Sequence, residues 1–199
     1  MTCWALIPVK ASAESKSRLA GVLDFDERKA LVDMMLERVV NAARQAHSIA
    51  RICLVGPSGL VVPNDVHLLD DPGKGLNPAV QSAFGSILSE EGDRPKRLII
   101  VAADLPSVTA RELDLLATAT PETIAIAPDR HETGTNALSL PLLQAADFRF
   151  AFGTDSFSRH KAETERIGLS LQIVLSLGLE YDVDEPDDLN RARNAIGPG

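Results

Sequence analysis

Apolar residues follow two different spacings, and segments with the one spacing alternate with segments with the other along the chain. Short, nearly continuous apolar runs predict buried strands, whereas apolar residues three or four positions apart predict helices. We expect strands at 3–9, 51–55, 66–69, 98–102, 123–127, 137–140 and 171–175. We expect helices at 26–46, 77–89, 109–119, 156–167 and 186–195. This alternation favours an α/β fold with a doubly wound, mostly parallel sheet and helices on both faces.

Several of the expected helices carry start signals. Asp24 or Asp26 can cap the first helix, and Asn77 can cap the second. Thr109, followed three residues later by Glu112, forms a capping box. No internal repeat, low-complexity tract or linker interrupts the chain, so residues 1–199 are expected to form a single domain.

Composition and charge narrow the classes of function. Hydrophobic residues make up 45% of the chain but aromatic residues only 4%, which suits a parallel sheet built from aliphatic side chains and covered by helices. The formal net charge of −8 argues against a nucleic-acid backbone as the main partner. An acidic protein that binds an anionic substrate needs a local cluster of cations, or a metal ion, at its site.

The cysteines and the N-terminus give further expectations. Cys3 and Cys53 lie in apolar runs and are expected to be buried thiols rather than a disulfide framework. No signal peptide is indicated, and no run approaches the roughly 20 apolar residues of a membrane span. We expect a cytoplasmic protein with no membrane partner, and we leave its oligomeric state, including a homodimer, open.

Ligands of doubly wound sheets bind outside the carboxyl ends of the strands, so the loops that follow the strands are the candidate sites. The loop after the first strand carries Lys10, Lys16 and Arg18 among small polar residues. Such a loop can wrap a phosphate, or it can be an ordinary solvated loop. The loop after the third strand contains Gly73 and Gly75, which let a backbone approach a ligand or form a tight turn without one.

Acidic residues follow the central strand and precede the last helix. Asp104 comes directly after 98–102 and can bind a cation, or act as a turn aspartate. Asp182 and Asp184 point the same way if the segment is extended, and they repel each other unless a cation lies between them. The alternative is a solvated acidic cap of the last helix, an interpretation that Asp187 and Asp188 fit well.

Two further loops offer small hydrogen-bonding groups. Thr135 stands just before a strand, between Gly134 and Asn136. The segment 152–160 leads into the start of a helix, and the start of a helix is a natural anion site. The alternative is that Asp155 or Ser156 only caps that helix.

Taken together and in order, these loops resemble the guanylyltransferases of deazaflavin coenzyme (F-420) biosynthesis. That family looks like a branch of the nucleotidyltransferase superfamily that includes the molybdenum-cofactor guanylyltransferases. The resemblance covers nearly the whole chain and rests on 7–10, 16–19, 73–77, 103–106, 127–130, 134–138, 152–153 with 156–157 and 160, and 182–184 with 186 and 188–189.

The resemblance implies a Rossmann-like fold of the nucleotide-diphospho-sugar transferase type. It also implies an enzyme that joins GMP from GTP to a phosphorylated three-carbon acid with release of pyrophosphate, and with Mg²⁺ as cofactor. The acid would be 2-phospho-L-lactate, phosphoenolpyruvate or 3-phospho-D-glycerate. Two alternatives stay open: a nucleotidyltransferase of the same fold with another nucleotide or acceptor, and a non-catalytic GTP-binding protein.

The resemblance also implies roles for individual residues. The positions that match magnesium ligands are Asp104, Asp182 and Asp184. The positions that match the phosphate-contacting loop are Lys10, Lys16 and Arg18, and with Asp104 the two lysines are the expected catalytic residues. The positions that match the nucleotide-reading loop are Gly73, Gly75 and Asn77. The positions that match the cradle of the acceptor's phosphate are Thr135, Gly153 and Ser156. One departure is Glu185, where the family often has threonine.

Overall fold

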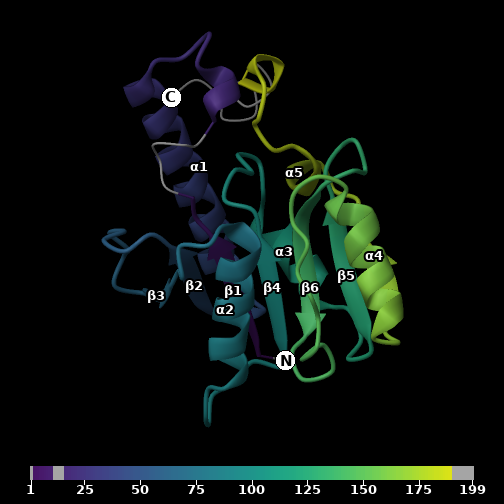
Figure 1. Cartoon of the computed structure of the whole chain (residues 1–199). Helices are drawn as coiled ribbons and strands as arrows, with labels where there is room; N and C mark the ends of the chain where they lie inside the picture. The colour runs from purple at the N-terminus through teal and green to yellow at the C-terminus, as the bar shows by residue number, and fades with distance from the viewer. Residues whose placement is uncertain (1, 11–15, 190–199) are drawn as a thin grey trace.

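The computed structural model describes residues 2–10 and 16–189 and contains one seven-stranded sheet, in the order β3-β2-β1-β4-β6-β5-β7 (Figure 1). The strands are β1 (Cys3–Pro8), β2 (Ile49–Gly56), β3 (Val66–Asp70), β4 (Arg97–Val101), β5 (Thr123–Pro128), β6 (Thr135–Pro141) and β7 (Ser170–Ile173). The helices are η2 (Ser17–Leu19), α1 (Phe25–Gln45), α2 (Leu76–Leu88), α3 (Ala110–Ala117), α4 (Ser156–Arg166) and α5 (Leu177–Glu180). The expected α/β fold with a mostly parallel, doubly wound sheet is confirmed.

The last expected helix begins at Pro186 and is helical through Leu189. Its remaining residues, 190–195, and residues 11–15 of the basic loop lie outside the described part of the chain.

Strand β6 is antiparallel to both of its neighbours, β4 and β5. The connection from β5 to β6 runs only from Asp129 to Gly134, whereas a parallel neighbour needs a crossover of about a dozen residues or more. The first residue of β6, Thr135, therefore lies at the edge where the parallel strands end. The amide of Ala102, just after β4, donates to the carbonyl of Asn136 at 2.8 Å and confirms this placement.

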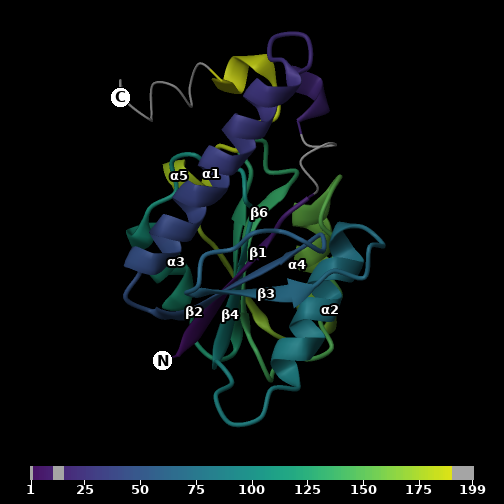
Figure 2. The same ribbon diagram turned by 90° about the vertical axis from the view of Figure 1, so that its left-hand side faces the viewer.

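The helices cover both faces of the sheet (Figure 2). Helices α1, α3 and α5 lie on one face, and α2 and α4 lie on the other. The alternate residues of β1 separate accordingly, because Ala5 and Ile7 belong to one buried cluster and Trp4 and Leu6 to the other. A strand that is buried on both faces reads as a continuous apolar run, which is why the sequence shows one there.

The two cysteines are buried free thiols, as expected. Burial raises the pKa of Cys3 to about 12 and that of Cys53 to about 11, so both stay protonated at neutral pH. Among the helices in the described residues, none combines the length and the apolar character that crossing a membrane requires.

The helix caps agree with the sequence at two starts and differ at two others. Asp24 and Thr109 each form a capping box with the residue three positions on. Asn77 does not cap α2, because Gly75 holds the cap position with φ 95°, and the Asn77 amide instead bonds the backbone of Phe152. Asp155 occupies the cap position of α4 with φ 56°, but its side chain makes no cap hydrogen bond.

The one-turn helix α5, which the sequence pattern does not predict, is held in place by Glu112. Oxygen Oε2 of Glu112 accepts from the amide and the hydroxyl of Thr109, both at 2.8 Å. Oxygen Oε1 accepts from the amide of Gly178 at 2.8 Å and from the hydroxyl of Ser176. One carboxylate therefore caps α3 and anchors α5. The side-chain Nδ2 of Asn136 also donates to the carbonyl of Leu179 at 2.9 Å.

Replacement of Gly178 by alanine should therefore destabilise the protein. A Cβ at this position would lie 2.6 Å from the carbonyl oxygen of Ser107 and against the Glu112 carboxylate. Overpacking of this kind costs about 1–3 kcal/mol, which urea unfolding of Gly178→Ala would measure. The control is Gly85→Ala in α2, where nothing lies within 4 Å of the new Cβ. It should be about 0.5–1 kcal/mol more stable than the wild type. Equal stabilities of the two variants would contradict the role of Gly178.

Candidate active site at the carboxyl edge of the sheet

Three carboxylates and one ammonium group meet where the parallel strands end. Asp104, Asp182 and Asp184 each offer an oxygen atom, and these oxygens lie within 4.8 Å of one another. The Nζ of Lys16 lies 2.5 Å from Asp104 Oδ2 and 2.8 Å from Asp184 Oδ1. The Lys16 side chain is only 8% exposed, so most of this contact is shielded from water. The structure thus brings together four of the residues that the sequence singles out.

Different elements supply these groups. Asp104 follows β4 near the centre of the sheet. The predicted strand 171–175 implied that Asp182 and Asp184 follow a strand. In the structure β7 ends at Ile173, and α5 lies between this strand and the two aspartates. Lys16 stands at the start of η2 with φ 58°, a left-handed conformation that is costly for a side chain other than glycine.

Asp188 bonds to the backbone of the acidic loop, residues 182–185, and the alternative of a solvated cap residue is wrong for Asp188. It is 4% exposed, and its Oδ1 forms an ion pair with Arg130. Its Oδ2 accepts from the amides of Asp184 at 3.1 Å and Glu185 at 2.9 Å. Asp188 thus bonds back to the residue that precedes the last helix, as the third residue of a capping box does. Asp187 is exposed, as expected.

The like charges raise the energy of the cluster. Burial, together with repulsion by Asp104 and Asp184, raises the pKa of Asp182 to about 6. Burial on its own would lower the pKa of Lys16, but the charges and hydrogen bonds of Asp104 and Asp184 raise it overall. Lys16 is therefore charged at neutral pH and compensates one of three negative charges. The cluster has an excess of negative charge that a bound cation would relieve.

The donor set fits magnesium. Mg²⁺ takes oxygen ligands at about 2.0–2.1 Å and usually binds one or two carboxylates together with substrate phosphates. The cluster offers carboxylate oxygens close enough for a shared cation after small side-chain movements. The contacts of Lys16 with Asp104 and Asp184 would have to loosen at the same time.

The residues expected to cradle the acceptor's phosphate also lie at this edge of the sheet. Thr135 is 8% exposed, and its hydroxyl lies 3.0 Å from Nδ1 of the buried His160. Ser156 is 1% exposed in the first turn of α4. Gly153 has φ 111°, a conformation that glycine allows, and its carbonyl accepts from the amide of Ser156 at 3.1 Å.

The other predicted residues are more exposed to solvent. The Lys10 side chain is exposed just after β1. The Arg18 side chain is 70% exposed, and its Nη1 lies 3.9 Å from an oxygen of Glu185, the residue that departs from the family pattern. Gly73 and Gly75 form the turn before α2 with φ of 70° and 95°. Within the described part of the chain, none of these four residues forms a hydrogen bond or an ion pair with Asp104, Asp182 or Asp184.

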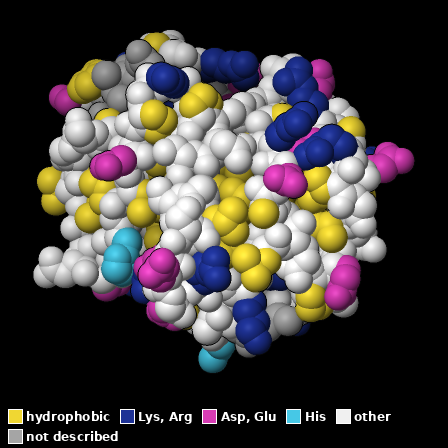
Figure 3. Space-filling model, turned by 60° about the horizontal axis from the view of Figure 1, so that its bottom comes forward, with side chains coloured by type: hydrophobic (Ala, Val, Ile, Leu, Met, Phe, Trp, Pro, Cys, Tyr) yellow, Lys and Arg dark blue, Asp and Glu magenta, His cyan; other side chains and the backbone are white. Residues whose placement is uncertain are grey.

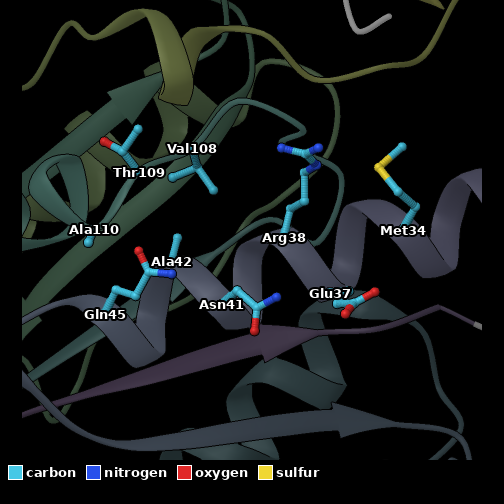
Figure 4. Close-up of a pocket in the computed structure, with 9 residues that line it drawn as sticks. All are labelled: Met34, Glu37, Arg38, Asn41, Ala42, Gln45, Val108, Thr109 and Ala110. Carbon is cyan, nitrogen blue, oxygen red and sulfur yellow. The ribbon is translucent and has the colours of Figure 1, made fainter. Parts of the chain in front are cut away.

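A hollow of about 500 Å³ lies elsewhere, between α1 and the start of α3 (Figure 4). Its lining includes Glu37 and Arg38, whose charges cancel, and none of the predicted site residues. The end of the molecule where the parallel strands begin carries its Lys and Arg side chains in several separate groups (Figure 3). Among the described residues, the group of carboxylates placed to share a metal ion is that of Asp104, Asp182 and Asp184 at the carboxyl edge.

The fold places the chain in a known structural class. A solved structure from Desulfovibrio desulfuricans G20, provisionally described as a nucleotide-diphospho-sugar transferase, matches with a TM-score of 0.73 and 17% identity. The match covers 96% of this chain and 86% of that one. At this identity the likeness establishes the fold, which is that of the nucleotide-diphospho-sugar transferases, as the resemblance implied.

Sequence comparison identifies the family. The family model described as "Guanylyl transferase CofC like" matches residues 3–192, and the chain belongs to this family. A phosphoenolpyruvate guanylyltransferase of Sphaerobacter thermophilus is 40% identical, over 95% of this chain and 91% of its own length. A 2-phospho-L-lactate guanylyltransferase of Halorubrum lacusprofundi is 36% identical, over 87% of this chain and 76% of its own length.

The raised pKa of Asp182 predicts that Asp182→Asn stabilises the metal-free protein at neutral pH. The folded-state pKa of about 6 lies above the ordinary value of 3.8, so ionisation above pH 6 opposes folding and protonation below pH 4 removes this penalty. In EDTA at pH 7.5 the variant should be about 1–2 kcal/mol more stable, since partial exposure reduces the full effect. The gain should disappear as the pH falls to 4.

Thermal unfolding across this pH range would measure the effect, at about 2–4 °C per kcal/mol. The exposed Glu91, replaced by glutamine, serves as the control and should show no such pH dependence. A stability difference that does not change between pH 4 and 7.5 would contradict the electrostatic explanation.

Proposed function

We propose that this protein is a magnesium-dependent guanylyltransferase that joins GMP from GTP to a phosphorylated three-carbon acid. The observation that carries the proposal is the contact of Lys16 with Asp104 and Asp184 beside Asp182, at the carboxyl edge of the sheet. Membership of the guanylyltransferase family supports it. Phosphoenolpyruvate is our first choice of acid, because the relative from Sphaerobacter thermophilus carries that name.

The proposed reaction balances without an added base. A phosphate oxygen of the acid attacks the α-phosphorus of GTP, a phosphoanhydride bond forms, and the bond to the β-phosphate breaks to release pyrophosphate. A phosphate monoester is largely dianionic at pH 7, because its second pKa is about 6. The protein therefore has no proton to remove, and its task is to align two anions and neutralise their charge.

The acidic and the basic residues would contribute to this task in different ways. Asp104, Asp182 and Asp184 would hold Mg²⁺, which when bound supplies charge neutralisation at the phosphates. Lys16, buried and charged, would contribute its ammonium group to the same phosphates as it leaves its carboxylate partners. The exposed Lys10 and Arg18 would meet the outer phosphates.

The neighbouring loops would bind the two organic parts. The turn at Gly73 and Gly75, before Asn77, would lie against the nucleotide. Thr135, Gly153 and Ser156 would receive the acid's phosphate, where the start of α4 adds a favourable dipole. The product would then serve the synthesis of the deazaflavin coenzyme F-420 in the cytoplasm.

An assay of pyrophosphate release tests the proposal. Protein with GTP and Mg²⁺ should release pyrophosphate with phosphoenolpyruvate, 2-phospho-L-lactate or 3-phospho-D-glycerate, and EDTA should stop it. A panel with CTP, ATP and UTP separates this function from that of another nucleotidyltransferase of the same fold. Binding of GTP without release of pyrophosphate, in folded protein with every acid, would favour a non-catalytic GTP-binding protein instead.

Replacement of Asp104 by asparagine should lower kcat about 10²–10³-fold without unfolding the chain, because it removes a carboxylate that would hold the Mg²⁺ that neutralises the phosphates. The control is Asp187→Asn, an exposed acidic residue of the same region that does not contact the cluster. It should keep kcat within about twofold of the wild type, a margin of about 0.4 kcal/mol. Unchanged turnover in Asp104→Asn, beside an active wild type, would remove Asp104 from the site.

A further inference from the structure

The segment from Arg149 to Phe152 runs extended between α2 and α4 without belonging to the sheet. Both helices lie on the same face of the sheet (Figure 2). Side chains of the two helices bond the backbone amides of this segment in alternation. The acceptors, in chain order from 149 to 152, are Glu163 at 2.8 Å, Gln81 at 3.4 Å, His160 at 3.0 Å and Asn77 at 2.7 Å. His160 therefore has a structural task, which is to accept a hydrogen bond from the amide of Ala151.

This task fixes which nitrogen of His160 carries the proton. The ring is 0% exposed and packs against Phe148 and Phe152, with centroids 5.8 Å and 4.8 Å away. Burial lowers its pKa to about 4, so the ring is neutral and carries a single N–H. A backbone amide can only donate, so Nε2, 3.0 Å from the amide of Ala151, is the unprotonated nitrogen. The proton must be on Nδ1.

The Nδ1–H of His160 meets the hydroxyl of Thr135 at 3.0 Å. Because this nitrogen donates, the Thr135 oxygen accepts, and the hydroxyl's own proton is directed elsewhere. Within the described part of the chain, the Thr135 hydroxyl forms no other hydrogen bond. Ser156 lies one helical turn before His160 on the same face of α4 and is 1% exposed, and its hydroxyl likewise forms no hydrogen bond with another described residue.

We propose that His160 is a positioning residue that makes the Thr135 hydroxyl a hydrogen-bond donor to a phosphate or carboxylate oxygen of the acceptor acid. Hydrogen bonds to an ionised oxygen are stronger than those between neutral groups, so the direction of this single proton matters for binding. The inference rests on the proposed function, since it assigns Thr135 to the acid and not to GTP.

Two conservative variants separate the structural task of His160 from its positioning task. In His160→Gln the side-chain oxygen can reach the place of Nε2 and accept from Ala151, but no donor faces Thr135. In His160→Asn the side-chain nitrogen can take the place of Nδ1 and donate to Thr135, but the amide of Ala151 loses its acceptor. We expect His160→Gln to raise KM for the acid about tenfold with KM for GTP unchanged, a loss typical of one hydrogen bond to a charged group. We expect His160→Asn to lose more stability but keep KM for the acid.

A double-mutant cycle with Thr135→Val checks that His160 acts through Thr135. In the Thr135→Val background, His160→Gln should produce no further rise in KM for the acid, because the hydroxyl that it orients is absent. The control is Gln81→Leu. This change removes a side chain that also bonds the backbone before α4, but it does not contact Thr135, so it should lower stability with little change in KM for the acid. Effects of His160→Gln and Thr135→Val that multiply, or a KM that rises in every variant in step with lost stability, would overturn the proposal.

The ¹⁵N spectrum of the histidine rings, recorded on the wild-type protein without substrates, tests the tautomer independently of activity. We expect His160 as the neutral Nδ1–H form, and the Nε2–H form would overturn the inference even if every variant were too unstable to assay. A wild type that is inactive with all three acids would refute the proposed function while leaving the tautomer assignment intact. An active wild type with an unchanged His160→Gln would refute only the inference.

Discussion

The repulsion among Asp104, Asp182 and Asp184 is the constraint on which the site depends. Three carboxylates with oxygens within 4.8 Å of one another do not stay together unless the fold holds them and a cation compensates them. Lys16 supplies one positive charge against three negative ones, and burial together with the repulsion by Asp104 and Asp184 raises the pKa of Asp182. The protein spends folding energy to keep a place ready for a further cation and for the phosphates that come with it, which is a common relation between stability and function.

The loops around this cluster are held by charged or polar side chains, each of which forms hydrogen bonds with two different segments. Glu112 caps α3 and anchors α5, and Asp188 pairs with Arg130 while it accepts from the amides of the acidic loop. His160 likewise holds the segment before α4 and meets Thr135. Each such side chain joins two segments that are far apart in the sequence. These side-chain bonds, and not the backbone bonds of the sheet, therefore fix the loops around the site relative to one another.

The sequence predicts the layers of this fold well, because burial on both faces of a strand leaves a continuous apolar run and the capping boxes at Asp24 and Thr109 are local signals. Asp182 and Asp184 could also be proposed because they stand two residues apart, and Asp104 could be proposed because it directly follows the central strand at the edge where ligands bind. What the sequence could not show is a bond between distant side chains, such as Glu112 to Gly178 or Arg130 to Asp188. Asp188, three residues after Glu185, could have been recognised as a capping residue, whereas the one-turn helix α5 leaves no periodic pattern to read.

The anchoring of α5 by Glu112 also has a consequence for the order in which the protein matures on the ribosome. Asp104 and Glu112 are synthesised well before Ser176, Gly178 and Asp184, and β1, β2, β3 and β4 can pair before those residues leave the exit tunnel. The nascent chain can therefore assemble much of its sheet while the three carboxylates are still apart. Docking of α5 on Glu112, and pairing of Asp188 with Arg130, can follow only later, and these contacts bring Asp182 and Asp184 to Asp104.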